Sequence, residues 1–530
     1  MRIRQFLVAG ALIALPFAAG AFLRQGPRRA PDGARLFAQV LQRIEDNAVD
    51  SLSRNAIYEK AARGLVKNLK DPYADLYSPE ELASFSRNSL RNKYGGLGMQ
   101  IEPQGDQIVV IRVFPNTPAE RGGVMTGDHI ISVDSVVVIG LKLEQVSNRL
   151  VGEPGTQVDV VFQRQGVAQP IKGRFTRAVI RPPAVPFTMM LDGGVGYIPL
   201  QSFSESASED VAKALVDLRS RGAHSYVFDL RGNGGGSLDE ALEISKYFLR
   251  PGQEVASVRH RGLEPKVYED DRPAPLIDSM PVVVMVDGST ASASEIVAGS
   301  LQDHDRAVVV GTTSYGKGLV QTLYTLDGGW ALKLTTGKWY TPSGRSIQAE
   351  HDRLEDDRFV EYAKDSVPSD TTHKRPVFKS DAGRQILGGG GVTPDVVVQP
   401  DTISDREREF FKALAPYSGP WRVTLYNYAL EMRSRLTPDF TVTPEMRHEF
   451  VDRLVKAKVP VRQAQFDSLP GLIDRAIEEQ FTRLAFGDST YFRRSIRTDP
   501  QIRTALDLLH RGTTQRKLLA LAAAEGKKTQ

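Results

Sequence analysis

Cysteine is absent from the 530 residues of this chain. Its absence excludes disulfide-stabilised scaffolds, zinc or iron–sulfur sites with thiolate ligands, cysteine nucleophiles and thiol lipidation. Covalent catalysis in this chain would therefore have to use serine, threonine, lysine or a carboxylate as its reactive group.

Histidine is scarce and the charges are nearly balanced. None of the eight histidines falls into an HxxxH, HExxH or HxH pattern, so we expect no metal site and no other cofactor. Lys and Arg number 68 against 64 Asp and Glu, and a net charge of only +4 argues against a nucleic-acid partner. With 41% hydrophobic and 25% charged residues, the chain has the composition of a soluble globular protein of roughly three or four domains.

The N-terminus combines a basic start with an apolar run. Two arginines lie within the first four residues, residues 6–23 are uncharged and largely apolar, and Arg24 follows. This pattern is typical of a signal peptide, and 18 residues are also just enough for one membrane-spanning helix. A buried core helix is the less favoured alternative. We therefore expect residues 1–24 to direct export to the bacterial periplasm or cell envelope. Whether residues 6–23 stay in the inner membrane as an anchor or are removed is left open.

The remaining chain divides into segments of different pattern. Apolar residues at helical spacing indicate a helical segment, glycine turns between short alternating strands indicate a β domain, and alternating strands and helices indicate a mostly parallel sheet. The expected segments are a helical one at 30–92, a β domain at 93–178, an α/β core at 179–400 and a helical extension at 401–530.

Within the α/β core, short runs rich in valine, isoleucine and aromatic residues predict individual elements. Strands are expected at 195–198, 224–229, 282–286 and 307–310, and helices at 207–221, 237–249 and 291–303. Residues 349–390 interrupt this pattern with charged and polar residues, and we expect them to form a surface excursion or a flexible lid.

A glycine-rich turn, Tyr94-Gly95-Gly96-Leu97-Gly98-Met99, opens the β domain. Such a turn can direct successive N–H groups at a terminal carboxylate, and the strand that follows can pair with an extended peptide. Taken alone, the turn would more often be an ordinary one. Further segments then follow in the order Thr117-Pro118-Ala119, Gly122-Gly123-Val124, Gly127-Asp128-His129-Ile130 and Val151-Gly152-Glu153-Pro154-Gly155-Thr156.

This ordered set of segments resembles a PDZ domain. One departure is Ser135, which stands after Asp134 where the family usually has glycine. The resemblance implies that the PDZ domain binds the C-terminus of a peptide through Gly96, Leu97, Gly98 and Met99.

A second glycine-rich segment, Asp229-Leu230-Arg231-Gly232-Asn233-Gly234-Gly235-Gly236, directly follows a predicted strand. Four glycines in five positions let the backbone approach a ligand with its N–H groups free, as an oxyanion hole requires. Ser237 stands where a dinucleotide-binding fingerprint needs its third glycine. A tight strand-to-helix turn without function is the alternative.

The segment Asp287-Gly288-Ser289-Thr290-Ala291-Ser292-Ala293-Ser294-Glu295-Ile296 joins a predicted strand to a predicted helix. The free N–H groups and the positive dipole end at the start of that helix favour developing negative charge. Ser292 and Glu295 also match an S-x-x-E capping box, so a purely structural role is an equally good interpretation of this segment alone.

Lys317 lies between two glycines in Gly311-Thr312-Thr313-Ser314-Tyr315-Gly316-Lys317-Gly318. This segment almost matches a P-loop, but Gly318 lacks the required hydroxyl and the following residues 319–324 look like a strand rather than a helix. Nucleotide binding is therefore disfavoured. The flanking glycines indicate a lysine with a tightly placed backbone rather than a solvated loop lysine.

A serine, a glycine loop and a fixed lysine are the catalytic parts of a serine hydrolase that uses no histidine. A desolvated lysine can be neutral near pH 7 and can therefore accept the proton of the serine hydroxyl. The segments TASASEI and YGKGLVQ, with the lysine 25 positions after the serine, resemble the C-terminal processing (tail-specific) peptidases, a family of Ser–Lys endopeptidases. The segments Thr341-Pro342-Ser343-Gly344-Arg345-Ser346-Ile347-Gln348 and Gly391-Val392-Thr393-Pro394-Asp395 extend the resemblance, which covers about residues 30–400.

The resemblance implies a ClpP/crotonase-like α/β protease core with an inserted PDZ domain and helical N- and C-terminal segments. It implies that Ser292 is the nucleophile, Lys317 the general base and Gln321 the residue that orients the lysine. The oxyanion would be held by the N–H of Ala293 and by one from the glycine loop, for which Gly234 and Gly235 are the expected donors.

The implied function is that of a serine endopeptidase of the cell envelope whose substrates are proteins or peptides with accessible C-termini. An adaptor or activator and homo-oligomerisation are left open. The insertion at 349–390 departs from the compact family pattern and puts substrate access in doubt, and the extension at 401–530 lies outside the match. The alternative function is that of a non-catalytic PDZ scaffold of the envelope, against which the intact set Ser292, Lys317 and Gln321 argues.

Overall fold

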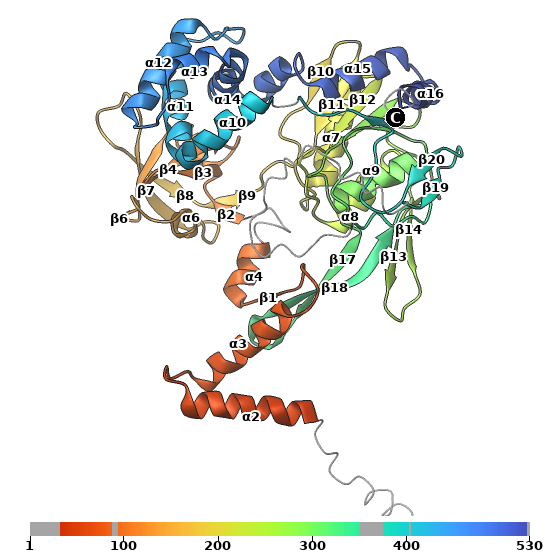
Figure 1. Ribbon diagram of the computed structural model, residues 1–530, viewed down its shortest axis with the longest axis horizontal. Helices are drawn as coiled ribbons and strands as arrows, with labels where there is room; N and C mark the ends of the chain where they lie inside the picture. The colour runs from red at the N-terminus through yellow and green to blue at the C-terminus, as the bar shows by residue number, and fades with distance from the viewer. Residues whose placement is uncertain (1–31, 87–93, 350–374, 402–403, 527–530) are drawn as a thin grey trace, which may run out of the picture.

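The computed structural model, shown in Figure 1, places four packed regions and an N-terminal helical arm. The described residues are 32–86, 94–349, 375–401 and 404–526. The expected signal peptide or anchor at 1–24 lies outside them, as does most of the charged insertion. No described helix is both long enough and apolar enough to cross a membrane.

The α/β core is built on a six-stranded sheet of order β10-β11-β12-β15-β16-β21, in which only β10 runs antiparallel to its neighbour. Every residue of β12 and β15 is buried, as expected for valine-rich strands covered on both faces. The predicted mostly parallel sheet is therefore confirmed. The strands are β10 (Met189–Leu191), β11 (Val195–Pro199), β12 (Ser225–Asp229), β15 (Val282–Val286), β16 (Val308–Gly311) and β21 (Val396–Val397).

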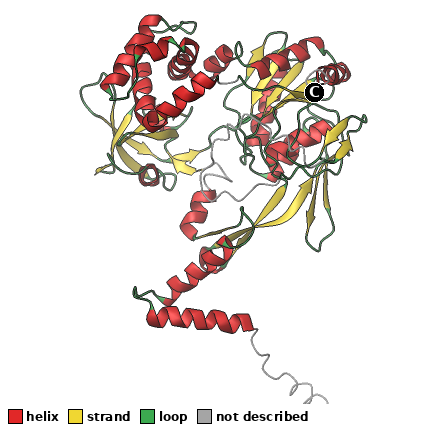
Figure 2. Ribbon diagram, viewed as in Figure 1, coloured by secondary structure: helices red, strands yellow, loops and turns green. Residues whose placement is uncertain are grey.

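Helices cover both faces of this sheet (Figure 2). Alternate residues of β15 point to opposite sides, so that Val282 and Val284 join the core beneath α7, α8 and α9, whereas Val283 joins the core beneath α15 and α16. The helices on the first face are α7 (Ala207–Ser220), α8 (Leu238–Lys246) and α9 (Ala293–Asp303). Those on the second face are α15 (Pro500–Arg511) and α16 (Gln515–Gly526). The C-terminal extension thus completes the core.

A second, five-stranded sheet joins the N-terminal segment to the core. Its strands are β1 (Asp75–Tyr77), β13 (Glu254–His260), β14 (Lys266–Glu269), β17 (Leu319–Thr325) and β18 (Ala331–Tyr340). Because β1 pairs with β18, the segment before the β domain is held next to the strands that follow Lys317. The helices of this segment are α2 (Asp32–Asn47), α3 (Arg54–Lys67) and α4 (Pro79–Phe85), and α2 projects from the body without a buried residue (Figure 1).

The expected PDZ segment forms a separate β domain with its own core. Its edge strand β3 pairs with β4 on one side, and α6 packs beside it. The elements are β2 (Tyr94–Gly96), β3 (Met99–Gln104), β4 (Gln107–Val113), α5 (Pro118–Arg121), β5 (His129–Val133), β6 (Val136–Val137), α6 (Leu143–Leu150), β7 (Gln157–Gln163), β8 (Ile171–Thr176) and β9 (Ala178–Ile180).

The first helices of the C-terminal extension form a fourth packed region against this β domain (Figure 1). Arg112 of β4 forms an ion pair with Asp488 of α14, and the Tyr426 hydroxyl donates a hydrogen bond to the Val110 carbonyl at 3.2 Å. The helices are α10 (Asp405–Leu414), α11 (Ser418–Met432), α12 (Pro444–Lys456), α13 (Gln463–Asp467) and α14 (Pro470–Ser495). The extension therefore contacts both the β domain and the α/β core.

The described end of the charged insertion is a short hairpin of β19 (Val377–Lys379) and β20 (Gln385–Leu387). Arg384 forms ion pairs with Asp305 and Asp395, and Ile386 is buried. In this part the insertion is held against the core rather than projecting from it, because its arginine has two carboxylate partners there. Residues 350–374 lie outside the described residues.

Candidate active site

The three predicted motifs of the core meet at one edge of the parallel sheet. The glycine loop follows β12, the Ser292 segment follows β15 and the Lys317 segment follows β16, and these three strands are neighbours. The carboxyl ends of parallel strands form the usual site of chemistry in such sheets. The Gly232 N–H donates to the Asp287 carboxylate at 3.0 Å, and the Tyr315 N–H donates to the Thr290 carbonyl at 2.9 Å, so the segments contact one another directly.

Ser292 stands at the junction between the strand segment and α9, in an unusual backbone conformation. Its φ is 56° and its ψ is −115°, a region that non-glycine residues rarely adopt. Strain of this kind costs on the order of 1–3 kcal/mol and persists where the surroundings enforce it, which is common at functional sites. The Ser292 N–H donates to the Glu295 carboxylate at 2.8 Å, which is one of the two bonds of the expected capping box.

The buried carboxylate of Glu295 joins the serine segment to the lysine segment. Besides the Ser292 N–H, it accepts hydrogen bonds from the Ser314 hydroxyl at 2.5 Å, the Gly316 N–H at 2.7 Å and the Lys317 N–H at 2.9 Å. Burial raises the pKa of Glu295, and these donors act in the opposite direction. Glu295 therefore does more than cap a helix, since it fixes the backbones of both predicted catalytic residues.

The glycine loop lies against Ser292 so closely that it has no room for a side chain. Gly235 has a φ of +100°, and a Cβ atom at this position would lie 2.9 Å from the Ser292 Cβ and 3.0 Å from the Ala293 nitrogen. The fully buried Asn233 holds the glycine loop against the serine segment, because its backbone carbonyl accepts hydrogen bonds from the Ala291 N–H and the Ser294 hydroxyl. The sequence-predicted loop and the serine segment are thus brought together.

The two expected oxyanion donors of the loop differ in their hydrogen bonding. The Gly235 N–H already donates to the Asn233 side-chain oxygen at 2.9 Å. The N–H groups of Gly234 and Ala293, in contrast, have no hydrogen-bond partner among the residues that the structure describes. Free, preorganised N–H groups are what an oxyanion requires. This arrangement favours Gly234 over Gly235 as the partner of Ala293.

Lys317 is fixed at its backbone and half-buried at its side chain. Its N–H is bound by Glu295, and its carbonyl accepts a hydrogen bond from the Trp339 indole at 3.0 Å. Burial lowers the pKa of Lys317, and the positive charge of Lys333 lowers it further, against the opposing effect of Glu295 and Asp71. A lysine held in this way has the depressed pKa that a general base needs and is not a solvated loop residue.

The side chains of Ser292 and Lys317 make no hydrogen bond to each other among the contacts of the described residues. The Lys317 ammonium group instead lies 4.6 Å from the centroid of the Tyr73 ring. Bonds between catalytic groups are often long in the absence of substrate and tighten when substrate is bound.

Gln321 lies on β17, and its amide nitrogen donates to the Thr335 hydroxyl at 3.4 Å. Thr335 is itself held by Asp71, whose carboxylate accepts from the Thr335 N–H at 2.9 Å and from its hydroxyl at 3.0 Å. No hydrogen bond joins Gln321 to Lys317 in the described part of the chain. The orienting role of Gln321 therefore stays a prediction.

Two residues of the site escaped sequence reasoning. Asp71 and Tyr73 lie in a short segment that the sequence shows only as a break between two helical patterns. Because β1, which follows this segment, pairs with β18, Asp71 contacts Thr335 of β18 and Tyr73 lies beside Lys317. No spacing in the sequence connects this segment to the lysine. By itself the sequence Asp71-Pro72-Tyr73 indicates only a turn.

The turn that opens the β domain has the geometry of a carboxylate site. The N–H groups of Leu97 and Gly98 have no hydrogen-bond partner within the described ranges, whereas the Leu97 carbonyl is held by the Ala119 N–H at 2.8 Å. Gly98 has a φ of +83°, and a Cβ atom there would lie 2.3 Å from Thr117. Beside the turn, the free edge of β3 faces α6, which is where an extended peptide pairs in β-augmentation.

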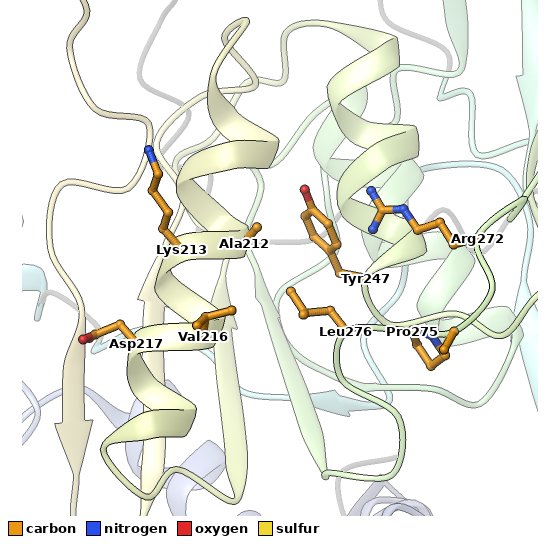
Figure 3. A pocket seen from close by; sticks show the side chains of 9 residues that line it. Ala212, Lys213, Val216, Asp217, Tyr247, Arg272, Pro275 and Leu276 are labelled. Carbon is orange, nitrogen blue, oxygen red and sulfur yellow. The ribbon is translucent and has the colours of Figure 1, made fainter.

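An open cavity of about 630 Å³ lies elsewhere on the core, between α7 and the segment after β14 (Figure 3). Val216, Tyr247 and Leu276 are among its lining residues, and none of the motif residues takes part. Within the described ranges, no group of three or more His, Asp or Glu side chains could hold a metal ion.

Comparison with known proteins identifies the families of the α/β core and of the β domain. Residues 194–358 match the model of peptidase family S41, and residues 95–172 match the model of the PDZ domain. The carboxy-terminal-processing protease of Bartonella bacilliformis is 36% identical over 316 residues, which cover 59% of this chain and 72% of that protein. The carboxy-terminal processing protease CtpA of Bacillus subtilis is 30% identical over 325 residues, covering 61% and 69%. A solved photosystem II D1 C-terminal processing protease is 30% identical, covers 58% of this chain and 82% of its own, and superposes with a TM-score of 0.34. The chain belongs to the family of PDZ-containing carboxy-terminal-processing serine proteases.

Proposed function

We propose that this protease uses Ser292 as its nucleophile and Lys317 as its general base. The observation that carries the proposal is the buried Glu295 carboxylate, which binds the backbone N–H groups of both residues and so fixes their relative position. The close approach of Gly235 to Ser292 places the glycine loop beside the same serine. Nucleophile, base and oxyanion donors are then carried by one hydrogen-bonded unit.

The mechanism follows from the state of each group. The lowered pKa of Lys317 raises the fraction of its amine that is neutral, and this neutral amine takes the Ser292 hydroxyl proton as the serine oxygen attacks the peptide carbonyl carbon. The N–H groups of Gly234 and Ala293 bind the oxyanion. The C–N bond breaks as the Lys317 ammonium group returns the proton to the leaving amine, which leaves an ester on Ser292. Lys317 then deprotonates a water molecule whose oxygen attacks the ester carbon. The bond from that carbon to the Ser292 oxygen breaks as the Lys317 ammonium group returns the proton to the serine oxygen, which releases the carboxylic acid product and restores the serine.

The test of this assignment is the cleavage of an unfolded protein substrate by Ser292→Ala and Lys317→Ala. Both variants should stay folded and lose cleavage. Matched controls are Ser289→Ala, an exposed serine of the same segment, and Lys338→Ala, an exposed lysine of β18, which should cleave normally. Undiminished turnover in Ser292→Ala or Lys317→Ala would end the assignment.

We further propose that the β domain selects substrates by their C-terminus. The N–H groups of Leu97 and Gly98, which have no partner among the described residues, would receive the terminal carboxylate, while the chain before it pairs with the edge of β3. Fluorescence anisotropy with an apolar peptide, free or amidated at its C-terminus, tests this. The free acid should bind at least about tenfold more tightly, since charge-assisted hydrogen bonds are lost on amidation. Equal binding of both peptides would contradict the proposal.

We also propose that the protein works in the cell envelope, which its N-terminal residues 1–24 support through their basic start and apolar run. Fractionation of cells that express the full chain should place it outside the cytoplasm, and a chain without residues 1–24 should stay inside. Cytoplasmic location of the full chain would contradict this part of the proposal. A non-catalytic scaffold predicts instead that C-terminal peptides bind without turnover.

A further inference from the structure

Arg231 stands directly before the glycine loop, and its guanidinium group has partners from two distant parts of the chain. It donates to the Asp229 carboxylate at 2.7 and 3.0 Å. It also donates to the Asp499 carboxylate at 2.7 Å and to the Gln501 side-chain oxygen at 2.9 Å. Asp499 and Gln501 lie at the start of α15, in the C-terminal extension and outside the part of the chain that matches peptidase family S41.

These contacts lie in a largely water-excluded cluster. Asp229 and Gln501 are buried, and the Tyr197 hydroxyl donates to the second oxygen of Asp229 at 2.8 Å. The ring of Phe492, in the last turn of α14, stacks on the Tyr197 ring with centroids 3.8 Å apart. Charged groups in such surroundings hold a defined geometry, because losing one partner leaves the other charge buried without compensation.

We propose that Asp499 and Gln501 are positioning residues for catalysis. They hold Arg231 in place at the start of the glycine loop and thereby fix the position of the oxyanion donors that follow Arg231 in the chain. The proposal rests on the proposed function, because it assigns those donors to the oxyanion. In this way the C-terminal extension becomes part of the catalytic machinery rather than an appendage.

The glycine loop needs such support because it has few side chains of its own to hold it. Its first N–H, that of Gly232, is bound by Asp287, and its middle is held by Asn233. The Arg231 N–H is bound by Asp229, so the guanidinium and the backbone of Arg231 are fixed by the same carboxylate. A displacement of the Gly234 N–H would weaken its bond to the oxyanion, which forms only in the transition state, and would therefore lower kcat rather than raise KM.

Asp499 offers a substitution that separates catalysis from folding. One of its oxygens caps α15 by accepting from the Gln501 N–H at 2.9 Å and the Ile502 N–H at 3.1 Å, while the other oxygen faces Arg231. Asparagine is an equally good N-cap residue, so Asp499→Asn keeps the cap. It removes the negative charge opposite the guanidinium group. Asp499→Ser, which also caps, tests the same loss without introducing an amide.

A matched control lies on the same helix. Asp507 forms an exposed ion pair with Arg511, one turn further along α15, and contacts neither Arg231 nor the glycine loop. Asp507→Asn therefore removes an aspartate charge from α15 without touching the proposed positioning contact, and exposed pairs of this kind contribute little to stability.

The experiment compares kcat, KM and the thermal unfolding midpoint of the full-length wild type, Asp499→Asn, Asp499→Ser and Asp507→Asn with one peptide substrate. We expect kcat to fall about tenfold or more in both Asp499 variants, with KM within about twofold of the wild type, because oxyanion contacts act on the transition state. Because Arg231 keeps the Asp229 carboxylate as its charged partner, the unfolding midpoint should stay close to that of the wild type. Asp507→Asn should cleave normally.

Wild-type kcat in a folded Asp499→Asn or Asp499→Ser protein would overturn the inference, and so would a fall that Asp507→Asn shares. If both Asp499 variants fail to fold, the residue is structural and the inference is likewise overturned. Failure of the proposed function has a different signature, namely an active Ser292→Ala variant. An inactive Ser292→Ala together with fully active Asp499 variants would overturn only the present inference.

Discussion

The ammonium group of Lys317 lies 4.6 Å from the centroid of the Tyr73 ring, which the N-terminal segment brings to the core. Tyr73 is itself half-buried, and burial, together with the neighbouring Tyr315 and the carboxylates of Glu295 and Asp71, raises its pKa, so it stays neutral. The ring shields the lysine from water, which favours the neutral amine, while the cation–π contact favours the charged form. Burial is the largest influence on the Lys317 pKa and lowers it, so we expect the shielding by the ring to be the stronger of its two effects.

Removing the Tyr73 ring should expose the base to water. We expect Tyr73→Ala to raise the pKa of Lys317, so that the acid limb of the kcat/KM profile moves to higher pH and activity near neutral pH falls. Tyr73→Phe keeps the ring and should keep the wild-type limb. The measurement is kcat/KM against pH for the three proteins, and an unmoved limb in a folded Tyr73→Ala variant would show that the ring does not shield the base.

The charge of Lys333 should also affect the pH at which the acid limb of the kcat/KM profile lies. Its positive charge lowers the pKa of Lys317, so Lys333→Gln should raise that pKa and move the acid limb to higher pH, whereas Lys333→Arg keeps the charge and should leave the limb in place. Lys338→Gln, on the exposed side of the same strand, is the control. A limb that moves to lower pH in Lys333→Gln would have the wrong sign for this account.

Gly235→Ala should abolish most activity because a Cβ atom would collide with Ser292 and Ala293. Loss of an oxyanion donor costs about a hundredfold or more in kcat. Gly222→Ala is a matched control, because Gly222 has a similar φ of +95° but nothing within 4 Å of the added Cβ. Both variants should lose about 1 kcal/mol of stability from the positive φ. Gly235→Ala should lose more stability because of the collision, and only Gly235→Ala should lose activity. Equal activities would show that the close approach is irrelevant to catalysis.

Glu295→Gln should weaken both the fold and the chemistry. A neutral amide presents one oxygen in place of two, so some of the four donors now bound by the carboxylate would be left buried without a partner. Each such group costs about 1–3 kcal/mol, which chemical denaturation would register as a lower free energy of unfolding. Glu144→Gln, at an exposed site of the β domain, should change neither stability nor cleavage. Wild-type cleavage by Glu295→Gln would contradict the proposed coupling of serine and lysine.

Sequence patterns predicted the central elements because their causes are local. The valine run at 282–286 is a strand with the predicted bounds, and the strands at 225–229 and 308–311 lie within one residue of expectation. The glycines of the loop at 232–236 and those on either side of Lys317 marked places where backbones meet, and the structure brings these segments to Ser292 and Glu295. Buried strands and tight turns leave such signals in short stretches of sequence.

The remaining features depend on contacts between segments far apart in the chain. Tyr73 reaches Lys317 only because β1 pairs with β18, and Asp499 reaches Arg231 only because α15 covers the second face of the sheet. A single sequence carries no signal for such pairings. The segment at 341–348, which extended the family resemblance, makes structural contacts. Its buried Arg345 forms an ion pair with Asp303, and the side-chain oxygen of its Gln348 accepts a hydrogen bond from the Gly318 N–H.

The central claim, that Ser292 is activated by Lys317, is tested most directly by covalent labelling with a peptidyl fluorophosphonate and mapping of the labelled residue by mass spectrometry. In the wild type and in Ser289→Ala, the serine oxygen should displace fluoride and the phosphonate should be found on Ser292. Ser292→Ala and Lys317→Ala should not be labelled. A label on another residue, or undiminished labelling of Lys317→Ala, would contradict the activation of Ser292 by Lys317.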